Sequence, residues 1–204
     1  MGYNIVSLKK ICNSIGETKA KELVADFECN LNKDVELFLR EKAIEFFKQG
    51  IAETFIVTSS YKDKQVIVGY FSIAHKITKI RRNVLSGNTK RRLLRFAEYD
   101  TLNKCYIISL PLIGQLGKNY KNNYDKLITG DILLKLAFDT IKVAQDIFGG
   151  KFVFLECEDT PKLKDFYESN GFVCFGKRNL DKDERETNSG QYLLQMLRDL
   201  SNYE

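Results

Sequence analysis

The stretch TPKLKDFYESNGF, residues 160–172, predicts a helix with a marked start and a marked end. Thr160 followed by Pro161 favours a helix start, because a threonine hydroxyl caps the first turn and proline lacks only an N–H that this turn does not use. The sequence ending at Gly171 predicts a sharp stop before a strand over 172–177. Tyr167 therefore lies near the end of the helix, where it either packs in the core or takes part in chemistry.

The segments before this helix predict a strand, a helix and another strand. KFVFLECE at 151–158 is nearly all apolar as far as Cys157, which is typical of a strand buried on both faces. A helix is predicted over 130–148, and a strand that bends at Pro111 over 105–118. The apolar residues expected on one face of the helix are Ile132, Leu133, Leu136, Ala137, Ile141, Ala144 and Ile147.

The N-terminal half predicts helices followed by a hairpin. A helix is expected over 17–25 and a long amphipathic helix over 27–50, ended by Gly50. Residues 54–60 and 65–77 are β-branched and aromatic, and the polar turn between them predicts a two-stranded hairpin.

The remaining segments complete an α/β pattern. We expect Tyr3–Leu8 to be a strand or a lead into a helix, KRRLLRFAEY to contain a short helix, and 191–197 to be a strand after a charged loop at 181–190. This order predicts an α/β fold with a mixed sheet. We expect a single domain over 1–204, in which 1–26 is an N-terminal extension and 76–104 is a basic insertion.

Composition excludes several classes of protein. No apolar run approaches the ~20 residues that a membrane span needs, and the N-terminus lacks the apolar core of a secretory signal. The five cysteines are odd in number and form no CxxC pair, which predicts free thiols and a cytoplasmic location. With His75 as the one histidine, we expect no metal site, and we expect His75 to be a strand-end residue.

Positive charge is concentrated in one segment. The formal charge is +5, and Lys76 to Arg95 contains eight basic residues and no acidic one. These are Lys76, Lys79, Arg81, Arg82, Lys90, Arg91, Arg92 and Arg95. The segment is either a solvated insertion or an anion-binding patch for a cofactor phosphate or RNA.

The stretch LECEDTPKLKDFYESNGF resembles the GNAT family of acetyl-CoA-dependent N-acetyltransferases. Leu155–Cys157 is similar to the end of the family's central strand, and Thr160 stands where the family commonly has a capping Asn. Phe166-Tyr167 with Gly171-Phe172 matches the end of the following helix. The resemblance covers roughly 27–197 and implies one GNAT-type domain with a mixed central β-sheet flanked by helices.

A second resemblance implies the cofactor site. PLIGQLGKNYKNNYDKLITGDILLKLA contains a strand like the one that pairs with the pantetheine arm, followed by the expected pyrophosphate loop. The loop departs from the family pattern, because Ile128 stands at the first glycine and Asp125 at the Gln/Arg. Amides at a helix N-terminus can still bind the pyrophosphate. The residues expected to bind acetyl-CoA are Leu116, Gly117, Lys118, Leu127, Ile128, Thr129, Gly130, Asp131 and Thr160.

The N-terminal half is similar to the toxin-like GNAT subgroup. The similar stretch is FECNLNKDVELFLREKAIEFFKQGIAETFIV, and some members of that subgroup acetylate aminoacyl-tRNA and pair with an antitoxin. The candidate partners are therefore a small-molecule or peptide amine, tRNA through the Lys76–Arg95 segment, and a second copy of the chain. We expect no membrane partner.

The resemblance assigns roles to two side chains. A tyrosine hydroxyl suits the protonation of a departing thiolate, which makes Tyr167 the expected general acid. Glu156 and Glu158 lie on one face of the strand, and we take Glu156 as the expected base while leaving Glu158 open. Three functions remain: an acetyltransferase for a small amine, a toxin acting on charged tRNA, and a CoA-binding module without catalysis.

Overall fold

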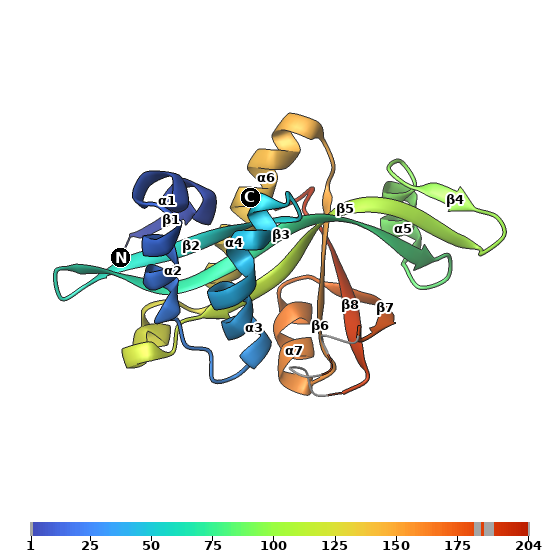
Figure 1. Cartoon of the computed structure of the whole chain (residues 1–204). Coiled ribbons are helices and arrows are strands. Elements are labelled where there is room, and N and C mark those ends of the chain that lie inside the picture. Colours follow the sequence, from blue (N-terminus) through green and yellow to red (C-terminus); the bar gives the residue numbers. More distant parts are fainter. Residues whose placement is uncertain (1, 182–184, 186–189, 204) are drawn as a thin grey trace. The chain divides into compact units, whose positions relative to one another are not determined.

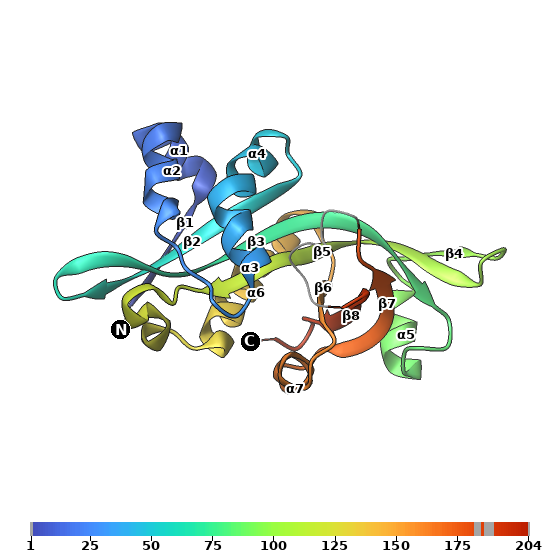
Figure 2. The same ribbon diagram turned by 60° about the horizontal axis from the view of Figure 1, so that its bottom comes forward.

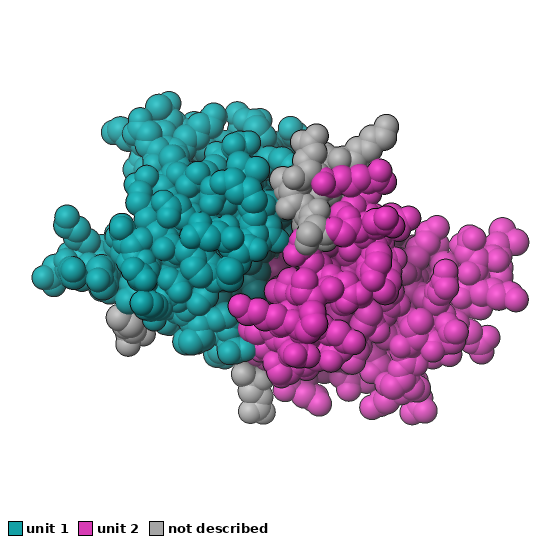
Figure 3. Space-filling view, turned by 90° about the horizontal axis from the view of Figure 1, so that it is seen from below, with its two compact units in different colours: residues 1–74, 114–137 teal, residues 75–113, 138–204 magenta. Residues whose placement is uncertain are grey.

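The computed structural model describes residues 2–181, 185 and 190–203, so most of the predicted loop at 181–190 lies outside the described residues. The chain divides into two compact units (Figure 3). Unit 1 is Met1–Ala74 with Gly114–Ala137, and unit 2 is His75–Ile113 with Phe138–Glu204. No helix in the described part of the chain is long and apolar enough to cross a membrane.

Unit 1 contains the predicted hairpin. β2 (Ala52–Tyr61) pairs antiparallel with β3 (Lys64–Arg81), and β1 (Tyr3–Ser7) adds to β2 as a third antiparallel strand. Lys62 and Asp63 join the hairpin with φ angles of 49° and 61°. Two consecutive residues of positive φ form the type of turn that matches the twist of a hairpin.

The predicted helix over 27–50 is wrong at its start and in its middle. The chain becomes helical only at Lys33, because the Asn32 side chain caps the helix by accepting from the Asp34 amide at 2.9 Å. A π-helical turn then separates two α-helical pieces. The helices of this part are α1 (Leu8–Ile15), α2 (Glu17–Ala25), α3 (Lys33–Leu37), the π turn η1 (Phe38–Lys42) and α4 (Ala43–Lys48).

These helices cover one face of the hairpin strands (Figure 2). Their apolar side chains form the core of unit 1 together with Ile56 and Tyr70 from the strands. The rings of Phe27 and Tyr70 meet edge to face at 5.1 Å, and the Tyr70 hydroxyl donates to the Val35 carbonyl. The N-terminal residues are thus part of this core, since Leu8 is fully buried in it.

The strands form a mixed sheet, as predicted. Their order among the described residues is β1-β2-β3-β5-β6-β8-β7, and β4 (Glu98–Asp100) pairs with β5. β5 (Cys105–Lys118) and β6 (Phe152–Glu158) are parallel, whereas β8 (Tyr192–Asp199) is antiparallel to both β6 and β7 (Val173–Asn179). The predicted strand at 191–197 is confirmed.

Helix α6 (Gly130–Phe148) agrees with the prediction in its bounds but differs in its buried face. Leu133, Leu134, Phe138 and Ile141 are buried, whereas Ile147 is 83% exposed. The expected face was therefore wrong at Ile147. The helix packs as far as Gln145, whose side chain donates to the Phe152 carbonyl at 3.1 Å, and its last three residues are exposed.

The basic segment is folded into unit 2. β3 runs on to Arg81, and α5 (Gly87–Leu93) begins earlier and ends earlier than the helix predicted in KRRLLRFAEY (Figure 1). Ile80 and Leu93 are fully buried in the core of unit 2, beside Phe152 and Leu197. The segment thus has its own apolar anchors, and its cations lie on a packed framework.

Candidate active site

Helix α7 (Pro161–Ser169) fixes the position of Tyr167 through both of its ends. The Thr160 hydroxyl accepts from the Leu163 amide at 3.4 Å, as the sequence predicts for a cap. At the other end Gly171 has a φ of 75°, and the Phe172 amide donates to the Tyr167 carbonyl at 3.0 Å. This is the Schellman arrangement, and it explains why the SNGF sequence follows the tyrosine.

The Tyr167 ring is buried but its hydroxyl is unused. The side chain is 8% exposed, and its ring meets that of Phe172 edge to face with centroids 5.6 Å apart. Among the described residues none hydrogen-bonds the hydroxyl. Burial raises the pKa of Tyr167, and the neighbouring Cys157 adds to this. The hydroxyl therefore stays protonated and available as a donor.

The carboxylate of Glu156 is engaged on both oxygens. Oε2 accepts from Nε of Arg178 at 2.9 Å, and Oε1 accepts from the Gln195 side chain at 2.9 Å. Nζ of Lys76 lies 3.9 Å from Oε2. Sequence reasoning missed Arg178 and Gln195, because only the register of β7 and β8 brings them to this point of β6.

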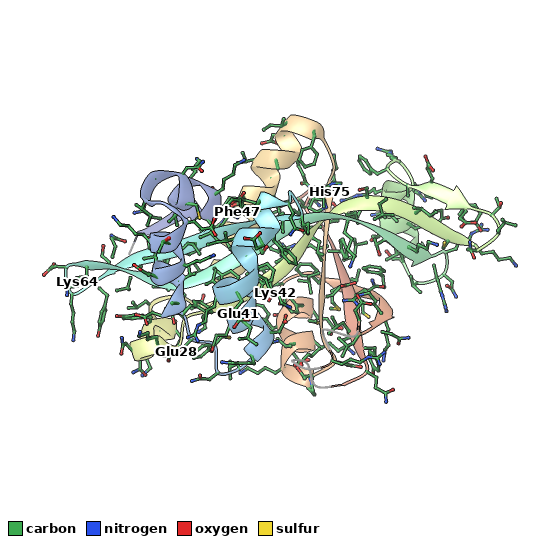
Figure 4. The ribbon with its side chains drawn as sticks, viewed as in Figure 1. Glu28, Glu41, Lys42, Phe47, Lys64 and His75 are labelled. Carbon is green, nitrogen blue, oxygen red and sulfur yellow. The ribbon has the colours of Figure 1, made fainter. Side chains whose placement is uncertain are left out.

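His75 lies within β3 and not at a strand end (Figure 4). Its Nδ1 is 2.9 Å from the Ser109 hydroxyl, and its ring packs edge to face on Phe148 at 5.9 Å. Both His75 and Ser109 are exposed, and within the described ranges no carboxylate bonds the imidazole. An exposed serine–histidine pair without an orienting acid lacks the parts of a hydrolytic triad.

In unit 1 the start of α6 is a capped helix N-terminus. The Thr129 hydroxyl accepts from the Ile132 amide at 3.2 Å, so Gly130 is the first helical residue. Ile128 has φ −144° and a side chain that is only 2% exposed. This extended backbone needs no glycine, which explains how isoleucine replaces the glycine of the family pattern. The Leu127 carbonyl accepts from the Tyr3 hydroxyl at 2.8 Å and fixes the preceding residue.

The loop before this helix takes its own path. It contains the 3-10 segment η2 (Lys121–Leu127), in which Asn122 and Asn123 have φ angles of 50° and 59°. Asparagine tolerates this left-handed conformation better than most residues. Nζ of Lys118 donates to the Asp125 carbonyl at 3.0 Å. The loop thus turns at two asparagines, five or more residues before Thr129.

The strand predicted to pair with pantetheine has an edge without a β6 partner. The ladder from β5 to β6 contains the pairs Leu112–Phe154 and Ile113–Leu155, and no later β5 residue pairs with β6 in the described part of the chain. Leu116, Gly117 and Lys118 lie beyond this point. Their backbone groups on that side are available to a ligand that pairs as a strand does.

The structure places the predicted residues in two separate groups. Leu116–Lys118 and Leu127–Asp131 belong to unit 1, with Asp131 in the first turn of α6. Tyr167, Glu156 and Thr160 belong to unit 2, where α7 follows β6 directly.

Comparison with solved structures identifies the fold. AtaT complexed with acetyl-methionyl-tRNAfMet is 17% identical, with 95% of this chain and 94% of that chain covered and a TM-score of 0.61. A tyrosine-to-phenylalanine variant of KacT is 15% identical, with coverage of 95% and 94% and a TM-score of 0.60. A tyrosine-to-phenylalanine variant of the AtaT toxin, bound to the C-terminus of the antitoxin AtaR and acetyl-CoA, is 14% identical, with coverage of 98% and 94% and a TM-score of 0.58.

The chain therefore has the GNAT fold over nearly its whole length, as its sequence motifs predict. No family model matches the sequence, and no curated protein matches it either. At these identities the likeness concerns the fold, and the activity has to be argued from the site.

Proposed function

We propose that this chain is an acetyl-CoA-dependent N-acetyltransferase. The observation that supports this most is the position of Tyr167, which a Schellman motif holds at the end of α7 and whose protonated hydroxyl bonds no residue that the structure describes. Among the described residues, the buried side-chain atoms without a partner do not include this hydroxyl, so it is accessible although its ring is buried. A substrate atom can therefore be its partner.

The chemistry that we propose transfers an acetyl group to an amine. Acetyl-CoA supplies the thioester; the amine nitrogen forms a bond to the carbonyl carbon and the carbon–sulfur bond breaks. Tyr167 donates its hydroxyl hydrogen to the departing sulfur. The raised pKa of this tyrosine keeps its hydroxyl protonated until the thiolate leaves, and the thiolate then takes the proton.

We propose Glu156 or Glu158 as the acceptor of the amine's proton, directly or through water. Each oxygen of Glu156 accepts one side-chain hydrogen bond, from Arg178 or from Gln195, and keeps a further lone pair that can take a proton. Glu158 lies two residues further on, half-buried at the end of β6. Glu156→Gln and Glu158→Gln should therefore differ: replacing the base should lower kcat by about 10²–10⁴-fold, and replacing the other glutamate should leave kcat nearly unchanged.

The start of α6 fits the pyrophosphate of acetyl-CoA. Thr129 caps the helix, Gly130 lacks a side chain, and the helix dipole favours negative charge at this end. Because Gly130 is the first helical residue, proline is tolerated there and removes only one N–H. We expect Gly130→Pro to weaken acetyl-CoA binding by about tenfold or more, equal to ~1.4 kcal/mol.

A matched control exists at the start of α5. Gly87 is likewise the first residue of its helix after Ser86. Gly87→Pro should leave acetyl-CoA binding unchanged in calorimetric titration. Equal binding by the wild type and a folded Gly130→Pro variant would reject this helix start as the phosphate site.

We further propose aminoacyl-tRNA as the acceptor, with its free α-amino group as the nucleophile. Two observations support this over a small-molecule amine. AtaT, whose fold this chain shares, was solved with acetyl-methionyl-tRNAfMet. Six of the eight Lys76–Arg95 cations of this chain lie on β3 and α5, and Arg82 and Arg95 follow within two residues of these elements. A patch of cations on regular elements suits a phosphate backbone.

Tyr167→Phe tests the enzymatic proposal. It keeps the ring contacts and removes only the hydroxyl, so the melting temperature and acetyl-CoA affinity should stay constant while kcat falls by about 10²–10⁴-fold. Tyr99→Phe, at a half-exposed ring on β4, is the control and should keep full activity. Full activity in Tyr167→Phe would show that Tyr167 only packs in the core and is not the general acid.

The acceptor is tested with acetyl-CoA and charged tRNA, using mass spectrometry of the amino acid released from the tRNA. We expect an acetylated α-amino group, and no product with uncharged tRNA. Acetylation of small amines but not of charged tRNA would reject tRNA as the acceptor, while the chain would still be an acetyltransferase. Tight acetyl-CoA binding without turnover on any amine would instead indicate a CoA-binding module.

A further inference from the structure

A basic pocket lies in unit 2, apart from the residues assigned to acetyl transfer, and it includes two cations of the Lys76–Arg95 segment, Arg92 and Arg95. Its volume is about 300 Å³, and it is lined by Arg92, Arg95, Phe96, Lys151, Ser201 and Asn202. These residues come from three places: the end of α5, the residue before β6, and the turn after β8. A pocket of this size holds a small ligand.

The walls of the pocket are tied together. Arg92 forms an ion pair with Asp199, whose Oδ1 also accepts from the Ser201 amide at 2.8 Å. The Leu200 amide donates to the Lys151 carbonyl at 2.7 Å. The turn after β8 therefore holds both the α5 side and the β6 side of the pocket in place, so a ligand would meet a preformed site.

The charge that remains in the pocket is positive. Arg92 is compensated by Asp199. Arg95 and Lys151 are exposed, and neither forms an ion pair with any described residue. Two uncompensated cations in one pocket favour an anionic ligand and repel each other without one.

An exposed aromatic ring stands beside these cations. Phe96 is 44% exposed, and it packs edge to face on the buried Phe152 with a centroid separation of 6.3 Å and an interplanar angle of 72°. Free inorganic anions gain nothing from a phenyl ring. A ligand that combines a phosphate with a flat ring gains from both the cations and Phe96.

We propose that this pocket binds one nucleotide, with its phosphate between Arg95 and Lys151 and its base on Phe96. The nucleotide belongs either to single-stranded RNA or to a free mononucleotide, since both present the same phosphate and ring. Base stacking on an aromatic side chain and phosphate contacts to cations are the two elements of single-strand binding sites.

This site is distinct from the acetyl-transfer chemistry. Lys151 stands before β6, whereas Cys157, the neighbour of Tyr167, stands six residues on, near the other end of the strand. At about 3.3 Å per residue the two lie roughly 20 Å apart. The proposal does not depend on acetyl transfer, because binding alone tests it.

The test uses three unlabelled competitors against a labelled octauridylate: the unlabelled octamer, uridine monophosphate and inorganic phosphate. Fluorescence anisotropy follows displacement from the full-length chain across a salt series. We expect Arg95→Ala with Lys151→Ala to weaken binding and to make its salt dependence shallower by about 0.7 in log–log slope per lost phosphate contact. Phe96→Leu keeps the packing on Phe152, and should weaken binding by about fivefold or more without changing that slope.

Lys79→Ala removes one charge of the same basic segment outside the pocket, and serves as the control. It should retain more affinity than Arg95→Ala alone. Displacement by the octamer only assigns the pocket to RNA, and displacement by uridine monophosphate at similar concentration assigns it to a free nucleotide. Two results would overturn the nucleotide site. One is displacement by inorganic phosphate together with an unchanged affinity in Phe96→Leu. The other is an equal loss of affinity in Lys79→Ala and Arg95→Ala.

Acetyl-CoA also contains a nucleotide, so its affinity is measured on the same variants. Unchanged acetyl-CoA binding in Arg95→Ala and Phe96→Leu is the expected result. A loss of acetyl-CoA affinity in these variants would overturn the proposal of a separate site. No binding of any probe by the folded wild type would overturn it as well.

Discussion

Gly117→Ala is the substitution whose cost the structure defines most sharply. A Cβ on Gly117 would come closer than 3.0 Å to Cγ1 of Val35. Val35 cannot easily move aside. It follows the Asn32 cap, which accepts from the Val35 amide at 3.3 Å, and its carbonyl accepts from the Tyr70 hydroxyl. A β-branched side chain in a helix also has one strongly preferred rotamer.

The expected magnitude follows from two opposing effects. Overpacking of this kind costs about 1–3 kcal/mol, whereas replacing a strand glycine by alanine recovers roughly 0.5–1 kcal/mol of backbone entropy. The backbone itself accepts alanine, because Gly117 does not have a positive φ. We therefore expect Gly117→Ala to lower the free energy of unfolding by about 1–2 kcal/mol.

A double-mutant cycle with Val35→Ala isolates the clash. Val35→Ala alone should cost about 2 kcal/mol, because it removes two buried methyl groups. In that background the alanine at 117 fills vacated space, so Gly117→Ala should become neutral or stabilising. Urea denaturation of the four proteins should give a coupling energy of about 1–3 kcal/mol.

Gly114→Ala is the control in the same strand. A Cβ there would find its nearest neighbour, the Ser72 carbonyl, at 4.0 Å. It should leave stability unchanged or raise it slightly. If Gly117→Ala proves as harmless as Gly114→Ala, or if its cost simply adds to that of Val35→Ala, the close contact with Val35 does not govern this position.

Three further predictions concern unit 2. Gly171→Ala should lower the free energy of unfolding by about 1–2 kcal/mol, because a φ of 75° strains any residue with a Cβ; Gly171→Asn should cost less in the same urea titration. A short pulse of iodoacetamide at pH 8 should label the exposed Cys174 well before Cys157, because burial protects the Cys157 thiol and raises its pKa to about 12. Equal labelling of the two cysteines, measured by mass spectrometry, would contradict the buried environment of Cys157. The contribution of Cys157 to stability should be constant below pH 9 and fall between pH 9 and 12, by up to about 1.4 kcal/mol per pH unit, because this thiol ionises first in the unfolded chain. In Cys157→Ala the alkaline decline of the free energy of unfolding should be shallower, and an unchanged decline would exclude this thiol as its source.

The parts of the fold that the sequence predicted were marked by local signals. Thr160, Pro161 and Gly171 cap a helix by rules that need no tertiary information, and the structure has the helix they predict. The hairpin turn at Lys62-Asp63 and the bounds of α6 were also predicted from local sequence signals. These signals are local because each depends on residues within one turn of the chain.

The parts that were missed depend on contacts between distant segments. The start of the helix at Lys33 is set by Asn32, but the sequence 27–31 contains apolar residues that fit a helical pattern and pack differently. Glu156 meets Arg178 only through the strand order β6-β8-β7. A reader of the sequence can count spacings, but the register between strands decides which side chains meet.

In the loop before α6, one feature could be predicted from the sequence and another could not. Its departure from the family pattern at Ile128 was visible in the sequence, and the extended backbone of that residue explains why it is tolerated. The compensating turn at Asn122-Asn123 was not visible, because asparagines in a polar loop have many possible conformations. Only the structure shows that these two take the left-handed one.

The division of the chain into units has a consequence for its synthesis. The chain passes from one unit to the other three times, after Ala74, Ile113 and Ala137, and each passage falls inside a regular element: β3, β5 and α6. On the ribosome, unit 1 is incomplete until residue 137 has emerged, and by then the first segment of unit 2 is already outside without its partners. Domains made in one piece can fold in order from the N-terminus. In this chain the first segment of unit 2 must wait for residues 138–204, and fragments cut at any single position would each carry parts of both units or an unfinished one.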